Sequence, residues 1–207
     1  LFTRLLFAIK YQEQRIVLSN LINSGSKILY DRNPRDRIAK VAPWLTLDGD
    51  PYPAVVDGKI VWILDGYTTS NGYPNSRKVN LADTADALTS RANAVASLED
   101  KSVNYIRNSV KATVDAYDGT ITLYQWDEKD PVLATWSKAF PGTVKAKSEI
   151  SKELLSHIRY PEDMFRVQRD ILSAYHVTSA DAFYGGQDFW RVPRDPSTFG
   201  ANAGNQP

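Results

Sequence analysis

Two stretches of the chain alternate hydrophobic and polar residues on either side of an Asp-Gly pair, which is the pattern of a β-hairpin. The first reads PAVVDGKIVWIL over residues 53–64, and the second reads VDAYDGTITLYQ over residues 114–125. Asp-Gly suits a type I′ turn, because both central residues of that turn need positive φ. We therefore predict two antiparallel hairpins, at about residues 51–65 and 109–126.

In the second hairpin, a two-residue loop at 118–119 would pair Ala116 with Ile121 and Val114 with Leu123. These four side chains would share one face, which we expect to be buried, while the opposite face stays wetter. That opposite face collects Lys111, Thr113, Asp115, Thr120, Thr122, Tyr124 and Trp126.

In the first hairpin, the same kind of loop pairs Val56 with Lys59 and Pro53 with Trp62. Pro53 then lies at a position that makes no ladder hydrogen bond, so its missing N–H costs nothing there. Prolines also prevent another strand from pairing on that side. We therefore predict an edge strand at residues 51–56 and a more central strand in KIVWIL.

Helical spacing and capping residues predict helices around the two hairpins. Asn33 and Asp130 each precede a proline, which is favoured at the first position of a helix. Further helices are expected at residues 1–21, 149–158 and 161–176, and a helix or an insertion near 83–98.

These elements predict an α+β domain, with an antiparallel sheet built from the two hairpins and helices mainly on one face. We expect a single soluble domain over residues 1–196, with a variable insertion at about 76–102 and a flexible linker at 197–207. The side chains expected in the core are Val114, Ala116, Ile121, Leu123, Ile60, Trp62, Val167 and Ile171.

Composition narrows the classes of function. The 207 residues include 25 basic and 24 acidic side chains, a balance that gives no reason to expect a nucleic-acid partner. No cysteine is present, which excludes disulfides, thiolate metal sites and cysteine nucleophiles. The apolar runs are too short to span a bilayer. The opening LFTRLLFAIK lacks an initiator Met and a signal-peptide pattern, so we expect a piece of a larger protein.

Four carboxylates lie close together in the sequence, at Asp48, Asp50, Asp57 and Asp65. Such a group is able to hold a divalent cation or to act as a general acid and base. Turn formation explains Asp57 and Asp48 better, and the calcium-loop pattern is missing. We therefore predict no metal site here.

Other catalytic patterns are incomplete. Ser24 and Lys27 match S-x-x-K, but the K-T-G element that accompanies it in penicillin-binding enzymes is absent. His157 and His176 lack metal-ligand spacing. No glycine loop suited to phosphate is present. We predict no catalytic residue, no metal and no cofactor.

Aromatic residues among Gly, Pro and Asn are the remaining candidates for ligand binding. Tyr67, Tyr73 and Trp190 lie in segments predicted to be loops, where aromatic rings stack on sugars or form interface hot spots. Anchoring of long loops onto the domain is the alternative explanation for these rings.

Three long stretches resemble uncharacterised protein family 0182. They begin PWLTLDGDPYPAVVDG at residue 43, NYIRNSVKATVDAYDG at residue 104 and HIRYPEDMFRVQRD at residue 157. The resemblance covers most of residues 27–75 and 103–196. It implies a large bacterial membrane protein whose membrane helices lie outside this chain, with this domain on the extracytoplasmic side of the cell membrane. It implies no activity, so no catalytic residue is carried over.

Three functions fit these observations. The sequence favours a non-catalytic module that binds a protein or a component of the cell envelope, because no catalytic set is assembled. The alternatives are a cell-envelope hydrolase that uses Asp pairs or Ser24 with Lys27, and the outer domain of a transporter.

Overall fold

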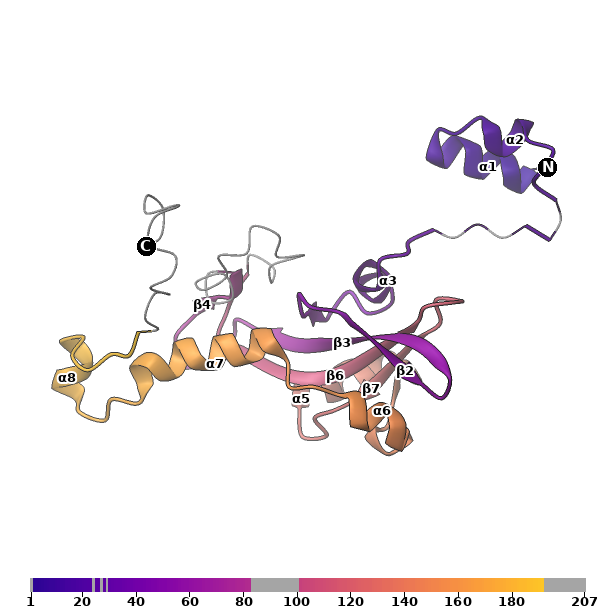
Figure 1. Cartoon of the computed structure of the whole chain (residues 1–207). Helices are drawn as coiled ribbons and strands as arrows, with labels where there is room; N and C mark the ends of the chain where they lie inside the picture. The colour runs from indigo at the N-terminus through magenta and orange to yellow at the C-terminus, as the bar shows by residue number, and fades with distance from the viewer. Residues whose placement is uncertain (1, 24, 27, 29, 83–100, 192–207) are drawn as a thin grey trace, which may run out of the picture. The chain divides into compact units, whose positions relative to one another are not determined.

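The computed structural model describes residues 2–23, 25–26, 28, 30–82 and 101–191 (Figure 1). The chain divides into two compact units, Leu1–Arg32 and Asn33–Pro207. The predicted helix near 83–98 and the predicted linker at 197–207 lie outside the described residues. The prediction of one domain over residues 1–196 stays a prediction.

The first unit contains two short helices instead of the single helix predicted over residues 1–21. Helix α1 spans Phe2–Tyr11 and helix α2 spans Arg15–Leu18. Gln12 has a φ of 54°, a left-handed conformation that ends α1. Neither helix contains a buried residue.

The second unit is built on a mostly antiparallel sheet of six strands, in the order β1-β3-β6-β7-β8, with β2 also paired to β3. Among the strands that the structure describes, β7 and β8 form the one parallel pair. The strands are β1 (Thr46–Leu47), β2 (Tyr52–Val56), β3 (Lys59–Ser70), β6 (Tyr105–Asp115), β7 (Ile121–Gln125) and β8 (Val144–Lys145). A separate pair joins β4 (Val79–Asn80) to β5 (Ser102–Val103).

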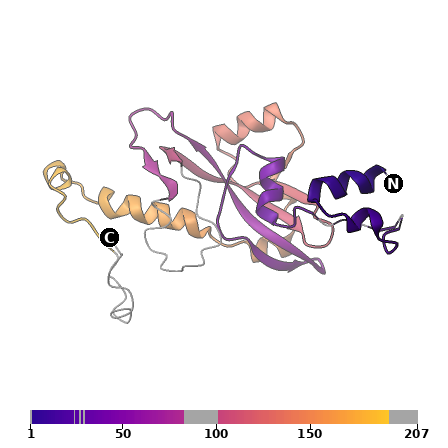
Figure 2. The ribbon, with the colours of Figure 1, turned by 90° about the horizontal axis from the view of Figure 1, so that it is seen from above.

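Helices cover both faces of this sheet, which corrects the prediction that they lie mainly on one. Leu133 of α5 (Pro131–Ala139) and Ile38 of α3 (Pro34–Val41) pack in one cluster with Leu64 of β3. Leu154 of α6 (Lys152–His157) packs with Ile63, the next residue of β3, whose side chain points to the other face. Helix α7 (Glu162–Tyr175) covers that face too, and Figure 2 shows α5 and α7 on opposite sides of the strands. Helix α8 (Ala180–Tyr184) and the short 3₁₀ helix η1 (Lys147–Glu149) complete the described elements.

The first hairpin has the predicted register. Val56 pairs with Lys59, and Pro53 pairs with Trp62. Asp57 and Gly58 have φ values of 50° and 74°, the two positive angles that a type I′ turn requires. Strand β2 pairs with β3 alone among the described residues, as expected of an edge strand.

The second hairpin differs from the prediction by two residues. Val114 pairs with Ile121 instead of Leu123, so the loop is longer than two residues. The Asp115 carboxylate accepts hydrogen bonds from the backbone N–H of Tyr117 (2.7 Å) and of Asp118 (3.1 Å). These hydrogen bonds make the turn begin at Asp115, so the chain reverses before it reaches the Asp-Gly pair. A shift of two preserves which side chains share a face.

The predicted core is partly correct. Val114, Leu123 and Val167 are buried, and Trp62 and Ile121 are half-buried. The predictions for Ala116, Ile60 and Ile171 are wrong, because all three are exposed. Ala116 falls in the longer loop.

The predicted helix caps are confirmed. The Asn33 side chain accepts a hydrogen bond from the N–H of Arg35 at 2.9 Å, and Asp130 accepts from the first turn of α5. The Asp130 carboxylate also accepts from the hydroxyls of Thr68 and Ser109, each at 2.6 Å. This cap therefore ties α5 to β3 and β6. Among the described helices, none is long and apolar enough to cross a membrane.

Candidate functional site

Three carboxylates come together where α7 begins. One oxygen from each of Asp48, Asp50 and Asp163 lies within 4.8 Å of the other two. Asp48 follows β1, and Asp163 stands in the first turn of α7, so the group joins segments more than a hundred residues apart. Asp48 and Asp163 are each only 3% exposed, whereas Asp50 is exposed.

Protein donors satisfy the two buried members of this group. Asp48 accepts hydrogen bonds from the Tyr67 hydroxyl and from the N–H of Asp50. Asp163 accepts from the N–H of Gly49 at 2.9 Å and from Arg166 at 3.2 Å. Oxygen ligands of this kind suit a hard cation such as Ca²⁺ or Mg²⁺. The donors already present nevertheless account for the cluster as part of the fold.

Crowding of negative charge shifts the titration of this cluster. Burial and the neighbouring Asp48 raise the pKa of Asp163 to about 6. Burial, with Glu162 and Asp48 nearby, also raises the pKa of Asp50. The pKa of the Tyr67 phenol is raised by burial and by the Asp48 charge, so this hydroxyl stays protonated and donates.

A buried ion pair lies beside the cluster. Lys111 of β6 contacts the carboxylate of Asp65 on β3, and their side chains are only 2% and 4% exposed. The Asp65 carbonyl also accepts from the N–H of Asp48 at 3.0 Å, which connects the pair to the carboxylates. Burial raises the pKa of Asp65, while the Lys111 charge opposes that rise.

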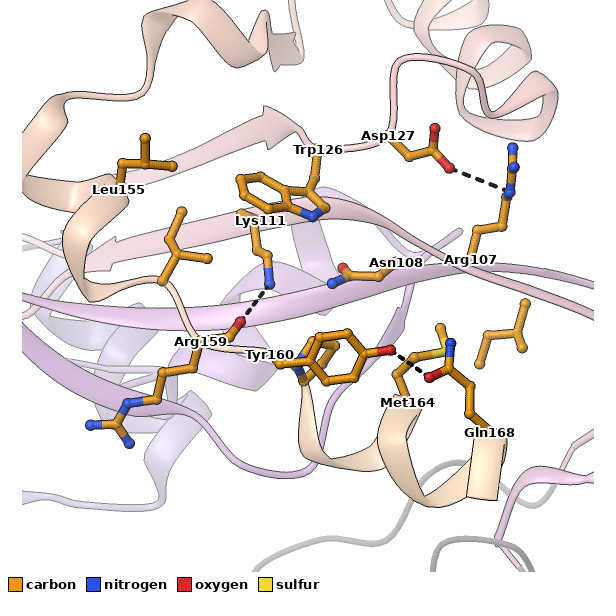
Figure 3. Close-up of a pocket in the computed structure, with 13 residues that line it drawn as sticks. Arg107, Asn108, Lys111, Trp126, Asp127, Leu155, Arg159, Tyr160, Met164 and Gln168 are labelled. Atoms are coloured by element: carbon orange, nitrogen blue, oxygen red, sulfur yellow. Dashed lines mark hydrogen bonds and ion pairs between the residues drawn. The ribbon is translucent and has the colours of Figure 1, made fainter. Parts of the chain in front are cut away.

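Lys111 also lines a pocket of about 600 Å³, shown in Figure 3. The pocket lies between β6, the end of β7 and the segment that leads from α6 into α7. Its lining residues are Ile106, Arg107, Asn108, Lys111, Trp126, Asp127, Leu155, Ile158, Arg159, Tyr160, Pro161, Met164 and Gln168. The volume is within the range of small-molecule sites.

Most polar groups around the pocket already have partners. Lys111 donates to the Arg159 carbonyl (3.2 Å) as well as to Asp65. Arg107 forms an ion pair with Asp127 at 3.3 Å. The Tyr160 hydroxyl donates to Gln168 at 2.5 Å, as the dashed line in Figure 3 shows.

Asn108 is the exception. Its side-chain oxygen, Oδ1, is buried and has no hydrogen-bond partner within the described part of the chain. Asn108 lies close enough to Asp65 to oppose part of the rise that burial causes in the pKa of that carboxyl. A buried carbonyl without a donor is unusual in a native fold and calls for an explanation.

The three aromatic residues predicted to bind a ligand do not come together. Tyr67 lies in β3 instead of a loop, and its side chain is fully buried next to Asp48. Tyr73 is exposed and stacks on Tyr105, and Trp190 stacks on His176 at 3.7 Å between ring centroids. Their role in binding stays a prediction.

Ser24 and Lys27 fall outside the described residues, and the remaining candidates have structural contacts of their own. Asp57 forms the turn of the first hairpin, as predicted. Nδ1 of His176 is 2.8 Å from the Leu172 carbonyl, which is the kind of structural role expected for that histidine.

Sequence reasoning missed Asp163, Lys111 and Asn108. The helix expected at residues 161–176 gives no reason to single out Asp163, and the predicted hairpin puts Lys111 on its wetter face. One feature of the sequence did point to Lys111. It lies in the middle of a strand rich in β-branched residues, where a lysine is rarely buried without a partner of opposite charge. The sequence offers no comparable signal for Asn108.

Comparisons with known proteins identify relatives but no activity. Residues 1–207 match the model of a family described as Uncharacterised protein family (UPF0182). A UPF0182 protein of Thermobifida fusca is 62% identical over 207 residues, which is all of this chain and 20% of the relative. One of Frankia alni is 60% identical over 200 residues, covering 96% of this chain and 20% of the relative. The chain thus spans about a fifth of the length of these relatives, and no solved structure matches it.

Proposed function

Because this chain belongs to the uncharacterised protein family UPF0182, and spans only a fifth of its relatives, we propose that it is a binding module within a larger membrane protein. In this proposal the module is non-catalytic and lies on the extracytoplasmic side of the cell membrane. The membrane is reached through segments outside this chain. The bound partner is a component of the cell envelope or a protein.

The pocket beside β6 is the observation that carries this proposal. It has the volume of a ligand site, and its lining mixes apolar side chains with a few polar groups, as binding sites do. The lining contains no Ser, Thr, Cys, His or Glu, and its one Asp forms an ion pair with Arg107. Its Lys111 is paired with Asp65 and the Tyr160 hydroxyl donates to Gln168, so the two lining groups that could act as nucleophiles are engaged by protein partners.

The carboxylate cluster favours the second candidate, an envelope hydrolase. Asp163 has a pKa raised to about 6 beside Asp48, and two carboxyls with divergent environments are typical of acid–base pairs. Both are nearly inaccessible to solvent, however, and only Asp50 is exposed. Burial of the pair makes hydrolysis the weaker candidate.

Retention on insoluble cell-wall polysaccharide tests the binding module. We expect the chain to sediment with the polysaccharide and Trp126→Ala to reduce the bound fraction at least fivefold. Tyr73→Ala and Trp190→Ala serve as matched aromatic variants, and a loss in either would place the contact at the rings predicted from the sequence. Sedimentation no greater than that of an unrelated protein of similar charge would argue against envelope binding.

The same incubation tests hydrolysis. Release of soluble fragments that continues with time and stops in Asp163→Asn would establish the hydrolase in place of the binding module. Constant soluble sugar supports the proposal.

A cysteine introduced into this chain provides a test of location, because these 207 residues contain no other cysteine. Asp118 is exposed in the second hairpin loop, so Asp118→Cys in the full-length protein provides a label site. A membrane-impermeant maleimide applied to intact cells should label this variant above the background of the unsubstituted full-length protein. Labelling only after lysis would place the domain in the cytoplasm.

A further inference from the structure

We infer that helix α1 lies on the surface of an anionic phospholipid bilayer, with its apolar side in the lipid. This contact uses residues of this chain, whereas the attachment to the membrane proposed above uses segments outside it. The inference goes beyond the binding module and does not depend on the ligand of the pocket.

The apolar side of α1 is exposed. Four apolar residues recur at positions i, i+3, i+4 and i+7, a spacing that places them on one side of a helix. They form a stripe of Phe2 (73% exposed), Leu5 (46%), Leu6 (50%) and Ile9 (66%). A stripe with this spacing normally faces a core, so its exposure indicates a partner outside the described residues.

The opposite side of α1 makes the contacts within the first unit, where α1 and α2 lie side by side (Figure 1). Arg4 donates to the carbonyl of Ser19, the residue that follows α2, at 3.5 Å. Phe7 stacks on Tyr11 and packs against Tyr30. Arg4 and Phe7 are half-buried as a result. Internal packing of the unit therefore uses the side of α1 away from the stripe.

The described part of the first unit has no core. Neither α1 nor α2 contains a buried residue, and Leu18 and Leu21 are 75% and 90% exposed. Helices as short as these are marginal in water without tertiary packing. An apolar surface that receives the stripe would supply the missing burial.

Basic residues next to the stripe favour an anionic surface. Residues 1–32 contain five basic and two acidic side chains and so carry a charge of +3, whereas the whole chain carries +1. Lys10 lies at the edge of the stripe, four residues after Leu6. Within the described part of the chain, neither Lys10 nor Arg15 forms an ion pair. Both charges are thus available to lipid phosphates.

The composition of the unit favours lipid over a protein partner. Phe, Leu and Ile on one side of a helix, with Lys and Arg beside them, are typical of helices that lie in the membrane interface. Lys10 is positioned over the rings of Tyr11 and Tyr30, 5.4 Å and 4.9 Å from their centroids, and Tyr and Lys are both common at the polar edge of a membrane. A fluid lipid surface also accepts the exposed leucines of α2 without a matching groove.

Binding to lipid vesicles tests the contact. Co-sedimentation compares vesicles of phosphatidylglycerol, which is anionic, with vesicles of phosphatidylcholine, which has no net charge. We expect the chain to bind phosphatidylglycerol about tenfold more tightly at low ionic strength. The preference should nearly vanish at about 1 M salt, where screening acts over a few ångströms.

Two double variants form a matched pair for the apolar contact. Phe2→Gln with Ile9→Gln removes two members of the stripe. Phe165→Gln with Leu172→Gln removes an exposed Phe and an exposed aliphatic residue at the same spacing on α7. The first variant should bind phosphatidylglycerol vesicles about tenfold more weakly, because it loses buried apolar area, and the second should bind as the parent does. All four side chains are exposed, and thermal unfolding checks that both variants are folded.

A second pair isolates the charges. Lys10→Gln with Arg15→Gln should weaken binding to phosphatidylglycerol and leave binding to phosphatidylcholine unchanged. Lys129→Gln with Lys138→Gln removes the same charge from exposed positions of the second unit and should have little effect.

A fluorescent label reports the position of the stripe without relying on the affinity of a variant. These 207 residues contain no cysteine, so Leu6→Cys carries a single environment-sensitive label. Phosphatidylglycerol vesicles should shift its emission to shorter wavelength as the label enters lipid. The same label on Asp118→Cys should keep the emission that it has in water, because Asp118 is exposed in the second unit.

The outcomes assign the stripe to lipid or to another partner. Equal binding to both lipids, or unchanged binding of Phe2→Gln with Ile9→Gln, overturns the inference. An emission shift that needs no vesicles and grows with protein concentration also overturns it, because the stripe then contacts a second copy. So does a failure to bind either vesicle, and a photoreactive group in place of Leu6 in the full-length protein would then identify the segment that covers the stripe. None of these results affects the polysaccharide assay, which tests the binding module separately.

Discussion

Removing the positive member of the buried Lys111–Asp65 pair should destabilise the domain strongly. Both side chains are almost fully buried, and the next carboxylate, Asp48, is connected to Asp65 through the backbone. Lys111→Met keeps the length of the side chain but leaves a carboxylate in a site of low polarity. Breaking a buried pair in this way costs about 3–5 kcal/mol of unfolding free energy.

The double variant Asp65→Asn with Lys111→Met shows whether that cost comes from the unpaired charge. Both charges are then absent, so the double variant should recover most of the loss and remain within about 2 kcal/mol of the parent protein. Lys147→Met is a matched control, because Lys111 and Lys147 both lie over the Trp126 ring but Lys147 is exposed. It should cost less than about 1 kcal/mol.

Urea unfolding at pH 7.5, with linear extrapolation to water, measures these differences. A second signature comes from pH. Without Lys111 the pKa of Asp65, already raised by burial, rises further, so the native state binds a proton that the unfolded state lacks. The deficit of Lys111→Met should therefore shrink as pH falls below neutrality. A loss under about 1 kcal/mol, or a double variant as unstable as the sum of its two single variants, would refute the reasoning.

Two further predictions concern buried carboxylates. The pKa of Asp163 in the folded state is about 6, against a usual value of 3.8. Its contribution to the free energy of unfolding is therefore fully present below about pH 4 and is lost as the pH rises through 6, a change of about 3 kcal/mol. Urea unfolding from pH 4 to 7.5 should show Asp163→Asn gaining relative to the parent over that window, and parallel curves would contradict it. Asp130→Ala removes a cap and the acceptor of two buried hydroxyls, those of Thr68 and Ser109, and should cost about 2–4 kcal/mol. Asp130→Asn, which keeps one oxygen, should cost less in the same assay, and equal losses would argue against the hydrogen bonds as the cause.

The local features of the fold were readable from the sequence. Asn33 and Asp130 were recognised as caps because a cap needs only a side-chain oxygen and the next turn of backbone. The first hairpin was read correctly because a two-residue loop fixes its own register. The predicted register of the second hairpin is wrong, because the Asp115 carboxylate accepts hydrogen bonds from the loop backbone and starts the turn before the Asp-Gly pair.

The candidate site was much less predictable. Asp48 and Asp50 were singled out, but their third partner Asp163 arrives from a distant helix. Asn108 became notable only because its side-chain oxygen is buried without a partner among the described residues. Each of these features depends on which residues surround a side chain in the folded structure. The spacing of residues along the sequence does not specify those neighbours.

The sequence by itself determined the class of the fold, the first turn and the helix starts, because backbone preferences and capping act over a few neighbouring residues. Only the tertiary structure decided which faces of the sheet are shielded from water. The face around Lys111 is polar along the strand, yet α6 and α7 pack on the same side of the sheet, where Lys111 and Asp65 form a buried pair. Burial of a polar side chain is set by what packs over it, and those covering segments lie tens of residues away in the chain.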